Sequence, residues 1–67
     1  MEQTAQQSYD AAMDSVNLIL RGQPEGMDAT EWADMVERNK EHLRIQIAKG
    51  AEFYGDLDLT PFENAVA

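Results

Sequence analysis

The stretch Met27–Gly50, MDATEWADMVERNKEHLRIQIAKG, decides the fold of this chain, because it has the start, the stop and the apolar spacing of one long helix. Asp28 is a favourable N-cap, and Glu31 follows three residues later, as in a capping box. At the other end, Gly50 is a favourable helix terminator. Together these features predict a helix over residues 29–49.

The hydrophobic residues of this segment recur at helical spacing and would form one stripe at about 100° per residue. Such a stripe is typical of a helix packed on a core. Asn39 lies within it, either as a partly exposed residue at its edge or as a buried polar residue that fixes the register of a helix pair. Ile45 lies almost opposite, as a lone surface residue or as part of a second contact surface. The stripe consists of Trp32, Met35, Val36, Asn39, Leu43 and Ile47.

An earlier segment predicts a second helix over about residues 5–21. Thr4 and Gln7 have the spacing of a capping box, and Arg21 followed by Gly22 is typical of a basic last turn and a stop. We expect the apolar side of this helix to consist of Ala5, Tyr9, Ala12, Met13, Val16, Ile19 and Leu20.

The connection between the two helices, residues 22–28, contains glycine and proline and is short enough to join antiparallel neighbours. The two helices are therefore expected to form an antiparallel hairpin in an all-α fold. In this hairpin, Tyr9, Val16 and Leu20 would pack against Trp32, Val36 and Leu43.

The residues after Gly50 are rich in large hydrophobic side chains for so short a segment. The sequence TPFE at residues 60–63 is a favourable helix start, with a threonine cap, a proline and a reciprocal glutamate, and it predicts a short third helix over residues 61–66. Residues 51–59 are expected to form an extended strap, or else a helical turn that continues past Gly50. This segment would cover the open side of a hairpin, either its own or that of a neighbouring subunit.

The chain has 67 residues and no cysteine. We expect one small helical domain, residues 1–67, with a thin margin of stability. Small folds are usually supported by disulfides, by a metal or by self-association, and a chain without cysteine has neither disulfides nor thiolate ligands. Because the hydrophobic side chains exceed what one copy could bury, we expect a homo-oligomer, a dimer or larger. The candidate interface comprises Leu18, Ile45, Phe53, Tyr54, Leu57, Leu59, Phe62 and Val66.

The net charge is −8, and the central helix contributes none of it. Residues 1–28 carry five acidic residues against one basic residue, and residues 50–67 carry four acidic residues and no basic one. Nucleic acid and membrane surfaces are disfavoured as direct partners, because both attract basic proteins. Residues 1–3 lack the features of a signal peptide, and no apolar run is long enough to span a bilayer, so a cytoplasmic location is expected.

No catalytic, cofactor-binding or metal-binding constellation is found in the sequence. His42 has no carboxylate one helical turn away and no nucleophile beside it, as a general base would need. Asp56, Asp58 and Thr60 are spaced like the first ligands of a calcium loop, but a proline stands where the turn glycine is needed. We therefore expect a protein that is not an enzyme and takes no cofactor.

Several short motifs follow one another from the central helix onward: Arg38-Asn39 with His42-Leu43, then Ala48-Lys49, then Asp58-Leu59-Thr60-Pro61-Phe62 and Ala65. Through these motifs, roughly residues 29–67 resemble short uncharacterised reading frames of tailed bacteriophages and prophages. The resemblance implies a viral accessory protein that works in the cytoplasm of a bacterial host. It implies no activity and transfers no functional residue.

The leading hypothesis is a small acidic interaction protein without catalytic activity, which assembles into a homo-oligomer and can bind a further protein. The alternative is an acidic decoy that mimics nucleic acid and occupies the basic groove of a nucleic-acid-binding host protein. The candidate phosphate mimics of such a decoy are Asp10, Asp14, Glu52, Asp56 and Asp58.

Overall fold

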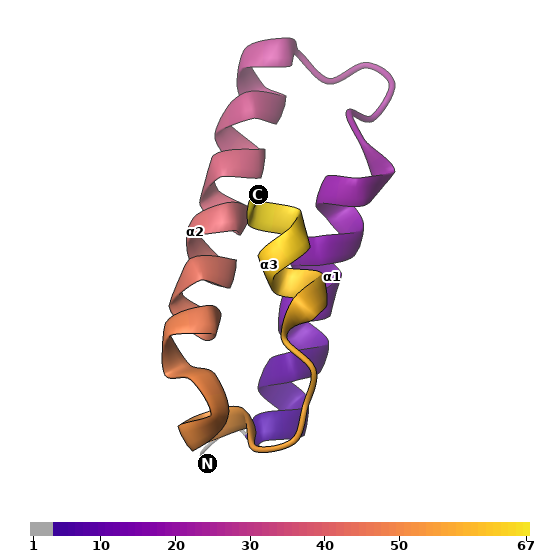
Figure 1. Cartoon of the computed structure of the whole chain (residues 1–67). Helices are drawn as coiled ribbons and strands as arrows, with labels where there is room; N and C mark the ends of the chain where they lie inside the picture. The colour runs from indigo at the N-terminus through magenta and orange to yellow at the C-terminus, as the bar shows by residue number, and fades with distance from the viewer. Residues whose placement is uncertain (1–3) are drawn as a thin grey trace.

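The computed structural model describes residues 4–67, and these form three helices and no strand. α1 spans Ala5–Arg21, α2 spans Ala29–Tyr54 and α3 spans Thr60–Val66. α1 and α2 form an antiparallel hairpin, and α3 packs against both (Figure 1). The predicted all-α fold, a hairpin with a short third helix, is confirmed. The signal-peptide interpretation concerned residues 1–3, which lie outside the described residues.

α1 begins with the predicted capping box. The Thr4 Oγ1 accepts a hydrogen bond from the Gln7 backbone N–H at 3.1 Å, and the Gln7 Oε1 accepts one from the Thr4 N–H at 2.9 Å. These bonds satisfy amide groups that a helix start otherwise leaves unpaired. α1 ends at Arg21, before Gly22 takes a positive φ of 85°. Both predicted ends of this helix are confirmed.

α2 begins where predicted but is not capped as predicted. Asp28 occupies the N-cap position in an extended conformation, and its side chain makes no capping hydrogen bond. At the other end, Gly50 has φ 58° and ψ −157°, a conformation almost restricted to glycine, and the helix bends there and continues to Tyr54. Of the two alternatives for the residues after Gly50, the additional helical turn is therefore correct. The strap consists of residues 55–59 alone.

The start of α3 also differs from the prediction. Thr60 belongs to the helix, and Leu59 occupies the N-cap position without a side-chain cap. The carboxylate of Asp58 instead accepts hydrogen bonds from the Thr60 Oγ1 at 2.6 Å and the Thr60 N–H at 3.0 Å. The hydroxyl bond first and the amide bond second hold the pKa of Asp58 below its usual range, because both favour the ionised carboxylate. Asp58, rather than Thr60, therefore organises the start of α3.

The core lies where the three helices meet. Leu43 of α2 and Phe62 of α3 are completely buried. Because a hairpin of two helices leaves one side of its interface open, α3 completes the core by burying Phe62 between α1 and α2. The other buried hydrophobic residues are Ala12, Val16, Tyr54 and Ala65.

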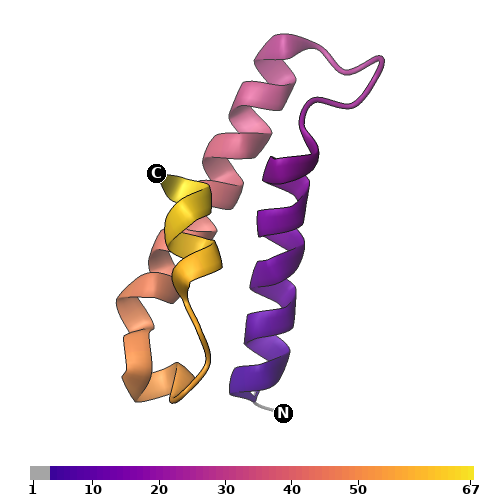
Figure 2. The same ribbon diagram turned by 45° about the vertical axis from the view of Figure 1, so that its right-hand side comes forward.

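α3 covers only part of the hairpin. Its seven residues rise about 10 Å, whereas residues 29–49 of α2, before the bend at Gly50, rise about 31 Å, and the first turns of α2 extend beyond α3 (Figure 1, Figure 2). Trp32 and Val36 in these turns are half-buried and do not join the core cluster. Leu20 is 73% exposed, so the predicted packing of Leu20 against α2 is wrong.

Asn39, the polar residue within the apolar stripe of α2, is half-buried. Its Nδ2 donates a hydrogen bond to the Met35 carbonyl one turn earlier, at 2.8 Å. The amide thus finds its partner within its own helix. Of the two interpretations, the partly exposed residue at the edge of the stripe agrees with this placement.

Candidate functional site

The C-terminal part of the predicted interface packs against the chain's own hairpin. Tyr54 and Phe62 are 3% and 0% exposed, so they cannot present a surface to a partner in this fold. Leu57, Leu59 and Val66 are partly buried against the same core. Of the two alternatives for this segment, packing within one chain is correct. The premise that one copy cannot shelter these side chains is therefore wrong for this group.

Four aromatic rings explain why the C-terminal segment folds back. The ring centroid of Tyr9 on α1 lies 5.0 Å from that of Phe62 and 6.2 Å from that of Tyr54. Tyr54 also contacts Phe62 and Phe53 in edge-on geometry, which is favourable for aromatic pairs. Phe53 lies at the rim, 36% exposed, with the Lys49 ammonium 4.8 Å from its ring centroid. Of this cluster, Phe53 is the member that reaches the surface most.

Two residues of the predicted interface lie outside the C-terminal segment. Ile45 on α2 is 50% exposed, and Leu18 on α1 is half-buried. The large hydrophobic side chain with the greatest exposure among the described residues is Leu20, which the sequence placed in the core. The surface that remains for interactions is therefore different from the predicted one.

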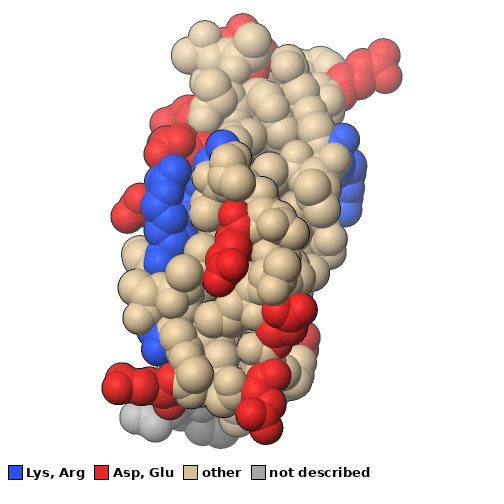
Figure 3. All heavy atoms as spheres, viewed as in Figure 1, with Lys and Arg blue, Asp and Glu red and all other residues tan. Residues whose placement is uncertain are grey.

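Leu20 stands at the edge of a groove between α1 and α3. The groove has a volume of about 370 Å³, and its walls are mainly hydrophobic, with Met13, Val16 and Leu20 on one side and Pro61 and Ala65 on the other. On the face that α3 and α1 form, uncharged surface predominates in the upper part of the view, and acidic side chains lie at its centre and lower edge (Figure 3). A groove of this size and character fits hydrophobic side chains of a bound partner.

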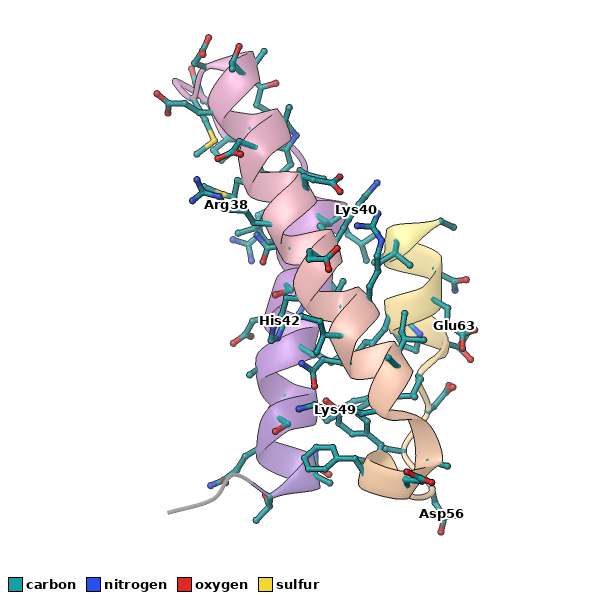
Figure 4. The ribbon with its side chains drawn as sticks, turned by 90° about the vertical axis from the view of Figure 1, so that its left-hand side faces the viewer. Arg38, Lys40, His42, Lys49, Asp56 and Glu63 are labelled. Carbon is teal, nitrogen blue, oxygen red and sulfur yellow. The ribbon has the colours of Figure 1, made fainter. Side chains whose placement is uncertain are left out.

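A smaller hollow of about 50 Å³ contains His42, the residue considered above as a general base. His42 is exposed on the side of α2 that faces α1, where Ser8 and Lys49 also line the hollow (Figure 4). None of the residues that line this hollow is a carboxylate, so nothing in it orients His42 as a general base requires.

A buried hydrogen bond lies beside this hollow. The Tyr54 hydroxyl donates to the Gln46 Oε1, and both side chains are buried. Burial raises the pKa of Tyr54, so the phenol stays protonated and remains a donor at neutral pH. This bond holds the turn after Gly50 against the middle of α2 and is structural.

The basic residues are concentrated on α2, where Arg38, Lys40 and Lys49 lie at different levels along the helix (Figure 4). Arg38 is 2.8 Å from Asp34 in an exposed i,i+4 ion pair. Arg44 is 3.0 Å from Glu37 and 3.2 Å from Glu41. Because exposed pairs of this kind contribute only a few tenths of a kcal/mol each, they add little to stability.

α1 carries its charges in two zones. Asp10 and Asp14 are exposed near its middle, and Arg21 is exposed at its end. Within residues 4–67, none of the three forms an ion pair. The charges of α1 are therefore available to a partner.

Neither a metal-holding cluster nor a membrane-spanning helix is found among residues 4–67. No group of three or more His, Cys, Asp or Glu residues there is arranged to hold a metal ion. None of the described helices combines the length and the hydrophobicity that crossing a membrane requires. Comparison of the chain with family models, with curated proteins and with solved structures gives no match. A function can therefore be inferred only from the surface just described.

Sequence reasoning missed the groove because Leu20 has the correct spacing for the apolar side of α1. Helical spacing shows which side of a helix a residue occupies, but not how closely the next element covers that side. The one available indication was the shortness of the predicted third helix, residues 61–66, which cannot cover both long helices along their length.

Proposed function

We propose that this chain is a helical interaction protein without catalytic activity, which self-associates through the surface around Leu20. The supporting observation is a leucine that is 73% exposed beside an open hydrophobic groove. Hydrophobic surface of this kind gains about 25 cal/mol for each Å² removed from water, and such surfaces commonly mark sites of protein association. In line with the resemblance to bacteriophage reading frames, we propose an accessory role in the cytoplasm of a bacterial host.

Sedimentation velocity of the purified chain, from micromolar to submillimolar concentration, tests self-association. The expected result is a concentration-dependent rise from the monomer mass of 7.5 kDa to about twice that mass. Circular dichroism over the same range should show constant helicity, because the fold of each copy is complete before association. A chain that sediments as a monomer at every concentration would refute the proposal.

The acidic decoy is the second candidate, and one observation favours it. Its five candidate phosphate mimics, Asp10, Asp14, Glu52, Asp56 and Asp58, are all exposed. A decoy would capture a nucleic-acid-binding protein from bacterial lysate at low salt and lose it at high salt, because exposed charge contacts are screened. Replacing the five by Asn or Gln should abolish this capture. Recovery of the chain alone at low salt would reject the decoy.

A further inference from the structure

The residues that α1 contributes to the groove form a stripe that is complementary to itself. Met13, Asn17 and Leu20 follow one another at helical spacing, and all three line the groove. Asn17 lies about one turn from each of the other two. An identical helix laid antiparallel over Asn17 would therefore set Leu20 of each copy against Met13 of the other, as a two-fold axis requires.

The direction of α3 favours the same arrangement. α3 rises from the strap in the same direction as α1, so the start of α3 lies beside the earlier part of the α1 stripe (Figure 1, Figure 2). Met13 and Pro61 accordingly form one end of the groove, and Leu20 stands at the other end. An antiparallel copy would bring its own Leu20 to the end formed by Met13 and Pro61. The large hydrophobic side chain that is most exposed in one copy would thus be covered by the other.

The charges of α1 favour the same antiparallel arrangement. Asp10, Asp14 and Arg21 fall on one flank of the stripe at about 100° per residue. In an antiparallel pair centred on Asn17, Arg21 of each copy would lie opposite Asp14 of the other copy and one turn from Asp10. In a parallel pair this flank would lie on opposite sides of the seam in the two copies, so these charges would not meet one another. Charge complementarity therefore selects the antiparallel pair, and the opposed helix dipoles agree with it.

We infer that the occupant of the groove between α1 and α3 is Leu20 of a second copy of this chain, in a two-fold dimer with antiparallel α1 helices. The inference rests on the proposed self-association and specifies its surface. Asn17 lies at the axis, where the donor and acceptor of its amide match those of the same amide in the second copy. Polar residues at such positions fix the register of helix pairs.

Disulfide trapping tests the axis directly. Because the chain has no cysteine, Asn17→Cys places one thiol per copy at the proposed axis. The Cα atoms of the two cysteines would lie within the short distance that a disulfide needs. Oxidation is therefore expected to give a covalent dimer as the main product. Ile45→Cys is the matched control, on an exposed position of α2 outside the groove. Absence of the Asn17→Cys dimer, or equal yields from both variants, would overturn the inference.

Two further sets of variants measure the contacts by sedimentation. Leu20→Ser is expected to raise the dimer Kd at least about tenfold, and Ile45→Ser less than about twofold. Arg21→Asp and Asp14→Arg should each weaken the dimer, because each sets like charges against one another. The double variant restores opposite charges and should dimerise more tightly than either single variant. A double variant no tighter than the single variants would overturn the antiparallel register.

Failure of this inference can be told apart from failure of the proposed function. If the wild-type chain dimerises and Leu20→Ser and Ile45→Ser weaken the dimer equally, self-association stands but this interface is overturned. A wild-type chain that is monomeric at every concentration overturns both. A monomeric chain that captures a bacterial protein, and loses it on Leu20→Ser, would assign the groove to a foreign partner and overturn the dimer.

Discussion

The Tyr9 hydroxyl donates a hydrogen bond of 2.6 Å to the backbone carbonyl of Asp58, which lies 49 positions later in the chain. This bond ties the strap to α1, and the ring of Tyr9 packs against Phe62 in the next element. Asp58 in turn accepts two hydrogen bonds from Thr60 at the start of α3. One contact between distant residues thus positions the helix that completes the core and forms one wall of the groove.

Removing the hydroxyl of Tyr9 and removing that of Tyr54 should lower the free energy of unfolding by different amounts. Tyr9→Phe removes a hydrogen bond in an exposed position and should lower the free energy of unfolding by about 0.5–1.5 kcal/mol. Tyr54→Phe leaves the buried Gln46 oxygen without its donor and should cost more, about 1–3 kcal/mol. Urea denaturation followed by circular dichroism measures both. A larger loss for Tyr9→Phe than for Tyr54→Phe would contradict the burial of the second bond.

Phe62 should be the residue of α3 on which the fold depends most. Phe62→Ala removes a completely buried ring and should lower the free energy of unfolding by about 3–5 kcal/mol. This is a large part of the stability of a small domain, so thermal unfolding should shift strongly downward. Phe53→Ala is the matched control, because Phe53 is 36% exposed and should cost much less. Equal losses in the two variants would show that Phe62 is not in the core.

Gly50 should resist substitution for a reason of backbone conformation alone. A Cβ added at Gly50 meets no atom within 4 Å, but φ 58° with ψ −157° is unfavourable for every L-residue. Gly50→Ala should therefore cost about 1–3 kcal/mol in chemical denaturation. A synthetic chain with D-alanine at this position should keep wild-type stability, since D-residues favour positive φ. If both variants lose the same stability, crowding rather than conformation is responsible.

The hydrogen bonds between Asp58 and Thr60 predict a pH effect. Thr60→Val removes the hydroxyl donor, so the pKa of Asp58 should rise toward its ordinary value of 3.8 in an NMR titration. Because the folded-state pKa lies below the unfolded one, this carboxylate stabilises the fold at pH values above 3.8, and the effect is lost as the pH falls through the folded-state pKa. The stability difference between wild type and variant should therefore narrow in acid. An unchanged pKa of Asp58 in Thr60→Val would contradict the assignment.

The sequence alone determined the three helices, because their signals are local. The Thr4–Gln7 capping box and the helical spacing along α1 and α2 depend on residues within a few turns of one another. Capping patterns are less reliable at Asp28 and Thr60, where the predicted caps are not formed. A side chain with capping chemistry can use other partners, and Thr60 donates to Asp58 instead.

Only the tertiary structure decided which hydrophobic residues are core and which are surface. Phe62 was predicted as interface and is buried, whereas Leu20 was predicted as core and is 73% exposed. Both residues have suitable spacing on their helices, but burial depends on where the other elements pack. The Tyr9–Asp58 bond and the bend at Gly50 direct the C-terminal segment onto the hairpin. A periodic pattern encodes neither a contact between distant residues nor the backbone conformation of a single glycine. With the C-terminal segment placed in this way, the groove beside Leu20 stays open.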